Sequence, residues 1–153
     1  MTFKNEAQLK RFLMEKCVKA VASTERKVHE EFAGNLNQFY MEFRPDEYIR
    51  TGELFNSLES TGAIQTSNGA VAEVRFNTPR WEHGWVPLQS GAYGYSSWDD
   101  KTILDVAMTG SYSGMPHGGY EEGTAIWTES MEKLGGKQGI NNLLKQELKK
   151  QGL

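Results

Sequence analysis

The chain has 153 residues, one cysteine and a formal net charge of −3, with 38% hydrophobic and 24% charged residues. This indicates one globular domain over residues 1–153 and excludes an internal disulfide framework, while the acidic balance disfavours a module that grips nucleic acid, whose affinity comes mainly from neutralising phosphates. Because the sequence has no run of about 18 apolar residues and no apolar signal core at its start, we expect no membrane span and synthesis in the cytoplasm.

Residues 5–43 carry the period of a helix. Asn5 and Gln8 resemble a capping box at its start, and Pro45 limits its end. At about 1.5 Å per residue, a helix of roughly 35 residues spans about 50 Å, more than a compact domain of this size needs. Two possibilities follow: two helices with a kink near Gly34, or one helix whose apolar stripe packs against a neighbouring subunit. The stripe consists of Leu9, Leu13, Cys17, Val21, Val28, Phe32, Leu36, Phe39 and Phe43.

Residues 48–58, YIRTGELFNSL, join this helix to the next element. Thr51 can cap a short amphipathic helix, on which Leu54 and Leu58 share one face with Ser57 beside them. A phosphate-binding turn is disfavoured because the stretch lacks the Lys of a phosphate loop. We expect a helix start that anchors the following strands to the long helix.

Residues 61–77 predict an antiparallel β-hairpin. The runs 61–66 and 70–76 flank Ser67-Asn68-Gly69, and Asn-Gly is a strong signal for a type I′ turn. The second run alternates as a half-buried strand does, with Val71, Glu73 and Arg75 on one face and Ala72, Val74 and Phe76 on the other.

Residues 78–123 form an irregular, aromatic-rich middle region. They hold three of the four Trp, four of the six Tyr and eight of the sixteen Gly residues. Residues 98–108 predict a short helix with Ser97 as its cap, and the rest is expected to be loop or short strand. A long loop region in a small domain is usually functional, and aromatic residues among glycines suit a protein–protein surface.

Residues 124–150 predict two C-terminal helices. Thr124 can cap the first, and Gly135-Gly136 closes it. The second carries one apolar stripe, formed by Ile140, Leu143, Leu144 and Leu148. A long helix, a hairpin, an irregular middle and C-terminal helices together define an α+β fold with a small antiparallel sheet.

The sequence contains no clear catalytic or metal-binding pattern. His29 lies on the long helix and His83 and His117 in the middle region, without the spacing of a metal site. Cys17 falls on the apolar stripe, where a packing role is expected, and residues 111–115, SYSGM, are not the GxSxG of a serine hydrolase. We therefore expect no catalytic, cofactor-binding or metal-binding residues and no enzyme activity. A small hydrolase that uses His83 and His117 with nearby acids is an alternative.

The pattern Tyr-x-Arg-Thr-Gly-x-Leu-x-x-Ser at residues 48–57 resembles the signature of the tail-completion or head–tail joining proteins of long-tailed bacteriophages. In that family a helix precedes the motif, a β-hairpin follows it, and an aromatic-Glu-Gly-Thr element leads to a C-terminal helix. Residues 120–124, YEEGT, fit the later element, and residues 81–84, WEHG, are a second possible match. The resemblance covers most of the chain.

The resemblance implies a structural protein of the virion neck. Its copies would form a ring, expected to be a hexamer, that joins the head connector to the tail and lines the channel for passing DNA. Ring closure would explain the long stripe and the aromatic region as subunit contacts. Another phage role, as a tail terminator or minor capsid protein, is the alternative. The candidate assembly residues are Tyr48, Arg50, Thr51, Gly52, Leu54, Ser57, Trp81, Trp85, Trp98 and Tyr120.

Overall fold

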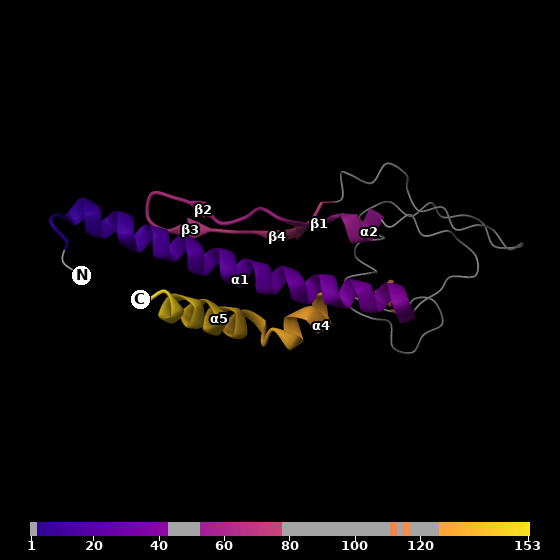
Figure 1. Ribbon diagram of the computed structural model, residues 1–153. Helices are drawn as coiled ribbons and strands as arrows, with labels where there is room; N and C mark the ends of the chain where they lie inside the picture. The colour runs from indigo at the N-terminus through magenta and orange to yellow at the C-terminus, as the bar shows by residue number, and fades with distance from the viewer. Residues whose placement is uncertain (1–2, 43–52, 78–110, 113–114, 117–125) are drawn as a thin grey trace, which may run out of the picture. The chain divides into compact units, whose positions relative to one another are not determined.

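The computed structural model describes residues 3–42, 53–77, 111–112, 115–116 and 126–153. Its elements confirm the predicted α+β class, with a long first helix, short antiparallel strands and two C-terminal helices (Figure 1). The helix predicted over residues 98–108 lies outside the described residues. The elements are α1 (Glu6–Glu42), α2 (Glu53–Asn56), β1 (Leu58–Ser60), β2 (Ile64–Gln65), β3 (Ala70–Val71), β4 (Val74–Phe76), β5 (Ser111–Tyr112), β6 (Met115–Pro116), α4 (Ile126–Lys133) and α5 (Gly136–Lys150).

Helix α1 is one continuous helix of 37 residues, so the alternative of two helices separated near Gly34 is wrong. A single glycine in a helix interior costs only about 1 kcal/mol relative to alanine, which a helix packed over this length absorbs. The predicted cap is present with one difference: the Asn5 side chain accepts the Gln8 N–H at 2.9 Å, but the Gln8 side chain accepts the N–H of Lys4, at 3.0 Å, rather than that of Asn5. No helix in the described ranges is both long and apolar enough to cross a membrane.

The predicted hairpin is confirmed, but its strands are interrupted. Strands β2 and β3 pair antiparallel, with Ile64 opposite Val71, whereas β1 pairs with β4 in a separate two-stranded sheet. Gly62 lies between β1 and β2 with φ 72°, a left-handed conformation that ends a strand. The type I′ assignment is wrong, because Gly69 does not adopt the positive φ that this turn requires.

The alternation predicted for the second run is also confirmed. Ala72, Val74 and Phe76 are half-buried, and the intervening side chains from Val71 to Arg75 are exposed. This run therefore turns one apolar face inward along its whole length, even where the strand pairing is broken.

The chain divides into two compact units that share α1. The first unit consists of residues 1–30, 60–74 and 134–153, and the second of residues 31–59 and 75–133. Each unit is thus assembled from segments far apart in the sequence.

In the first unit, the β2–β3 hairpin lies along one side of α1 and α5 along the other (Figure 1). The buried carboxylate of Glu25 on α1 accepts the Gly62 N–H at 2.8 Å, which fixes the hairpin to the helix. Met14 and Ala20 are the buried apolar residues among those described in this unit. Because this core is small, polar contacts carry a large share of its specificity.

The second unit has the larger apolar core. Its buried apolar residues among those described are Phe32, Leu36, Leu54 and Ile126. The ring of Phe32 lies 5.2 Å from that of Trp127 on α4 and 6.3 Å from that of Phe76 on β4, measured between centroids. These are favourable separations for aromatic pairs, so one phenylalanine of α1 joins a helix and a strand.

A buried polar contact accompanies this aromatic cluster. The Asn35 side-chain amide on α1 donates to the Ser130 hydroxyl on α4 at 2.7 Å, and its oxygen accepts a hydrogen bond from Lys133. Asn35 and Ser130 are both almost completely buried. Their mutual hydrogen bond satisfies groups that would otherwise destabilise the core, and it sets the register of α4 on α1.

Two glycines close the turn between α4 and α5, as predicted. Gly135 and Gly136 have φ 73° and 62°, values that side chains rarely adopt. Three residues further on, a methyl group at Gly139 would overlap the carbonyl oxygen of Leu134. The turn thus depends on glycine both for its backbone conformation and for a close approach.

We expect Gly139→Ala to lower the free energy of unfolding by about 3 kcal/mol, because the added methyl group must displace the backbone at Leu134. Gly34→Ala provides the control: apart from the adjoining backbone of α1, no atom lies within 4 Å of the added methyl group, and alanine should stabilise α1 by about 0.5–1 kcal/mol. Urea unfolding of both variants measures the difference. Equal stability of the two would contradict the tight turn.

Candidate assembly surface

Two residues of the motif at residues 48–57 are buried in the second unit. Leu54, on α2, and Ser57, directly after it, are both buried. The Ser57 hydroxyl donates to the Leu54 carbonyl oxygen at 2.7 Å, and the Ser57 carbonyl oxygen accepts the Asn77 N–H at 2.7 Å. Leu54 and Ser57 therefore hold α2 against the end of β4. They support the surface residues of this region from a buried position.

The predicted shared face of Leu54 and Leu58 is not formed. Helix α2 ends at Asn56, and Leu58 begins strand β1. The two hydrogen bonds of Ser57 account for this change, because one closes the helix end and the other starts pairing with the segment after β4. The remaining candidates, namely Tyr48, Arg50, Thr51, Gly52, Trp81, Trp85, Trp98 and Tyr120, lie outside the described residues.

The second unit exposes several apolar side chains among its described residues. Met41, near the end of α1, is 81% exposed, and Phe55 on α2 is 40% exposed. The Phe55 ring lies 6.2 Å from the Tyr40 ring in an edge-on arrangement. On α4, Trp127 is half exposed although its ring also contacts Phe32. Phe55 and Trp127 were not among the assembly residues predicted from the sequence, although the sequence does show aromatic residues spread widely along the chain.

The first unit also exposes apolar side chains. Ile64 and Val71, 57% and 52% exposed, stand opposite each other on the β2–β3 hairpin. Leu9 and Leu13, both 38% exposed, begin the apolar stripe of α1. The stripe is thus buried at Phe32 and Leu36 and uncovered near its start, the pattern expected of a helix whose first turns await a partner.

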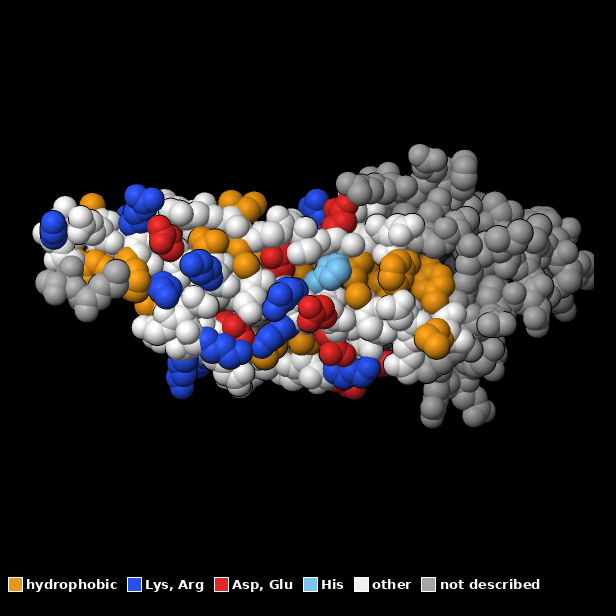
Figure 2. Space-filling model, in the orientation of Figure 1, with side chains coloured by type: hydrophobic (Ala, Val, Ile, Leu, Met, Phe, Trp, Pro, Cys, Tyr) orange, Lys and Arg blue, Asp and Glu red, His pale blue; other side chains and the backbone are white. Residues whose placement is uncertain are grey.

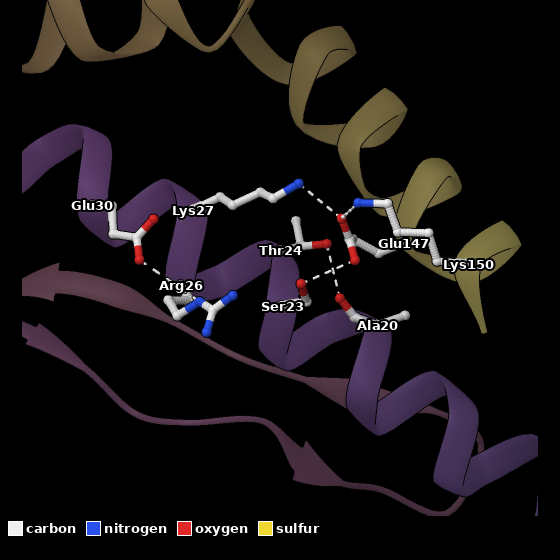
Figure 3. Close-up of polar contacts among 8 residues, drawn as sticks. All are labelled: Ala20, Ser23, Thr24, Arg26, Lys27, Glu30, Glu147 and Lys150. Carbon is white, nitrogen blue, oxygen red and sulfur yellow. Dashed lines mark hydrogen bonds and ion pairs between the residues drawn. The ribbon is translucent and has the colours of Figure 1, made fainter.

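Helix α5 is held to α1 by a cluster of charged and polar side chains around Glu147 (Figure 3). The buried Glu147 carboxylate accepts hydrogen bonds from Lys150 at 2.7 Å, from Lys27 at 2.8 Å and from the Ser23 hydroxyl at 3.0 Å. Lys27 and Ser23 come from α1, one helical turn apart. Two ammonium groups and a hydroxyl therefore occupy three of the roughly four hydrogen-bond acceptor sites of this carboxylate.

These contacts perturb the titration of the cluster. The hydrogen bond from Lys150, with further hydrogen bonds from Lys27 and Ser23, lowers the pKa of Glu147 from its ordinary value of 4.5 to about 2. The same Glu147 contact raises the pKa of Lys150. Glu147 and Lys150 are therefore both charged at neutral pH, and the cluster acts as a structural clamp over the physiological range.

The described residues provide no group of three or more His, Cys, Asp or Glu side chains suited to a metal ion. Cys17 is a half-buried thiol on α1, in keeping with the predicted packing position. His83 and His117 lie outside the described residues. The surface available for function in the described ranges therefore consists of apolar patches and charged side chains.

In comparisons with protein-family models, curated proteins and solved structures, nothing matches this chain.

We expect Ser57→Ala to lower the free energy of unfolding by about 1 kcal/mol, because the hydroxyl that closes α2 is lost from a buried position. The control is Ser60→Ala, which removes an exposed hydroxyl at the end of β1 and should change stability by less than about 0.5 kcal/mol. Urea unfolding monitored by circular dichroism compares them. If both variants match the wild type, the Ser57 hydroxyl does not fix α2.

The lowered pKa of Glu147 predicts a pH dependence of stability. Because the folded-state pKa lies below the ordinary value, the contribution of Glu147 is fully present above about pH 4.5 and is lost as the pH falls towards 2. Glu147→Gln should be less stable than the wild type at pH 7 and should lose less stability over that acid interval. Melting temperatures from pH 7 to pH 2 measure both effects.

The control for this pH series is Glu15→Gln, which removes a carboxylate from an exposed ion pair with Arg11. Exposed pairs contribute only about 0–1 kcal/mol, so its acid profile should follow the wild type. A Glu147→Gln profile parallel to that of the wild type would contradict the assigned role of the cluster.

Proposed function

We propose that the protein is a structural component of a bacteriophage virion. In this proposal its copies form a ring in the neck, expected to be a hexamer, that joins the head connector to the tail and encloses the channel for DNA. It acts through binding surfaces and has no catalytic site or cofactor.

The observation that carries the proposal is the position of the motif at residues 48–57 in the order of elements. A helix of 37 residues precedes the motif, the β2–β3 hairpin follows it, and helices α4 and α5 come last. The tail-completion family that the motif resembles has the same order. The motif and the order of elements agree, and together they support the proposal.

Exposed apolar groups give independent support for assembly. Leu9 and Leu13 on α1, and Met41 and Trp127 in the second unit, are all accessible in the single chain. Apolar groups in such number on a small protein favour a surface that a partner covers. In a ring, each copy would cover part of this surface on its neighbour.

Electron microscopy and native mass spectrometry test the ring directly. The purified protein, alone and mixed with the connector and tail proteins of the phage that encodes it, should give closed rings. Heads and tails from a phage that lacks the protein should join when it is added. A protein that remains monomeric with these partners and does not restore joining would overturn the proposal.

The motif itself supplies a sharper test. We expect Arg50→Ala to reduce the yield of joined particles about tenfold or more, because a guanidinium at this position can hold several oxygen acceptors at once. Arg50→Lys should restore only part of the yield. Counting joined particles by negative-stain microscopy gives the readout, and unimpaired joining by Arg50→Ala would remove Arg50 from the assembly residues.

A further inference from the structure

The fold separates charge between its two units. The segments of the first unit contain eleven Lys and Arg and six Asp and Glu residues, a net charge of +5. The segments of the second unit contain six Lys and Arg and fourteen Asp and Glu residues, a net charge of −8. The separation is not evident along the sequence, because the first unit is built from three separate segments.

The positive charge of the first unit is presented on helices α1 and α5. On the face shown in Figure 2, Lys and Arg side chains gather over the first part of α1 and over α5. Several of the basic side chains are neutralised within the chain: Arg11 and Arg26 pair with glutamates one turn away, and Lys27 pairs with Glu147. On α1 and α5, five exposed lysines make no ion pair in the part of the chain that the structure describes. We call them the basic surface: Lys10, Lys19, Lys137, Lys145 and Lys149.

Apolar groups accompany these lysines on α1. Leu9 and Leu13 are partly exposed and lie on the same helix as Lys10. Charged groups alone give specificity and fast encounter rather than much affinity. Nearby apolar side chains add buried area, which makes this a surface suited to binding another protein.

The second unit offers the complementary chemistry. On α4, Glu132 is exposed, Glu129 is partly exposed, and neither makes an ion pair within the described residues. Trp127 on the same helix is half exposed. An acidic surface with a large aromatic side chain matches a basic surface with exposed leucines.

We propose that the basic surface of one copy binds helix α4 of a neighbouring copy, where Glu129, Glu132 and Trp127 provide the acidic and aromatic contacts. This inference rests on the proposed ring and specifies its contact: each interface is heterologous, pairing unlike surfaces, which is the arrangement that closes a ring. Pairing of the basic surface of one copy with the basic surface of another would bring identical charges together, so that arrangement is disfavoured. We choose a second copy as the partner because the net charges of the two units, +5 and −8, are complementary.

Nucleic acid is the competing occupant of a basic surface. The whole chain carries a net charge of −3, and its acidic unit would repel the phosphates of any duplex that approached. A second copy also brings the half-exposed Trp127, which can pack against the exposed Leu9 and Leu13, whereas the phosphate backbone of DNA offers no apolar contact. The observations therefore favour protein over DNA.

Self-association should respond to salt and to neutralisation of the basic surface. Raising the salt from about 0.05 M to about 0.5 M shortens the range of charge interactions several-fold and should weaken association about tenfold or more. Lys145→Gln/Lys149→Gln should weaken it similarly at low salt. The matched control is Gln65→Glu/Asn68→Glu, which changes the net charge equally on the hairpin, on the other side of α1, and should have a much smaller effect.

Charge exchange tests the pairing of the two surfaces. Lys145→Glu/Lys149→Glu alone and Glu129→Lys/Glu132→Lys alone should each remain folded by circular dichroism and lose self-association. Mixed in equal amounts, the two variants should assemble again, because each then meets a neighbour of opposite charge. A ring with an even number of copies, such as the proposed hexamer, accommodates their alternation. Sedimentation velocity and native mass spectrometry measure the assemblies.

Three results would overturn the inference. The first is self-association that does not change with salt concentration or with either of the two charge reversals. The second is failure of the two folded variants to assemble when mixed. The third is loss of duplex DNA binding on reversal of Lys145 and Lys149 with self-association unchanged, which makes DNA the occupant. If the wild-type chain stays monomeric at low salt but still joins heads to tails, this contact is overturned and the proposed function stands. If it forms charge-dependent rings that do not join heads to tails, the contact is supported and the proposed function is refuted.

Discussion

The packing of helix α1 is the constraint on which the rest of the structure depends. A helix of 37 residues with an apolar stripe along much of its length cannot bury that stripe alone. It becomes stable where other segments cover it, and those segments come from distant parts of the chain. In one unit the hairpin and α5 do so, and in the other β4 and α4 do so. Where coverage stops, at Leu9 and Leu13, the stripe is open to a partner.

Buried polar groups decide how the covering segments dock. Glu25 fixes the hairpin through Gly62, Glu147 fixes α5 through Ser23 and Lys27, and Asn35 fixes α4 through Ser130. Apolar contact alone would allow several registers along a regular helix. A buried carboxylate or amide tolerates one register, because displacement by a turn would leave it unsatisfied. The small core of the first unit makes this discrimination more important there.

The sequence predicted most of the helices and strands, but it did not predict which of them contact one another. Apolar periodicity located α1 and α5, glycines located the turn between α4 and α5, and alternation located the inward face around Val74. Local signals failed at Leu58, where hydrogen bonding of Ser57 to the distant Asn77 overrode helix spacing, and at Gly69, which does not adopt the positive φ of the expected turn. At the candidate site, the motif identified Leu54 and Ser57 but not that both are buried. The separation of charge was invisible to a linear reading, because it appears only when three segments come together in one unit.

The clamp at Glu147 also bears on how the chain is made. Its hydrogen bond to Ser23 joins residues 124 positions apart. At about 5–20 residues per second, α1 leaves the ribosome roughly 6–25 seconds before the helix that clamps it. During that interval the side of α1 that α5 will cover is open to other nascent or finished chains. Exposed charged pairs on α1, such as Arg11–Glu15 and Arg26–Glu30, are features of the kind that limits aggregation of such an uncovered surface.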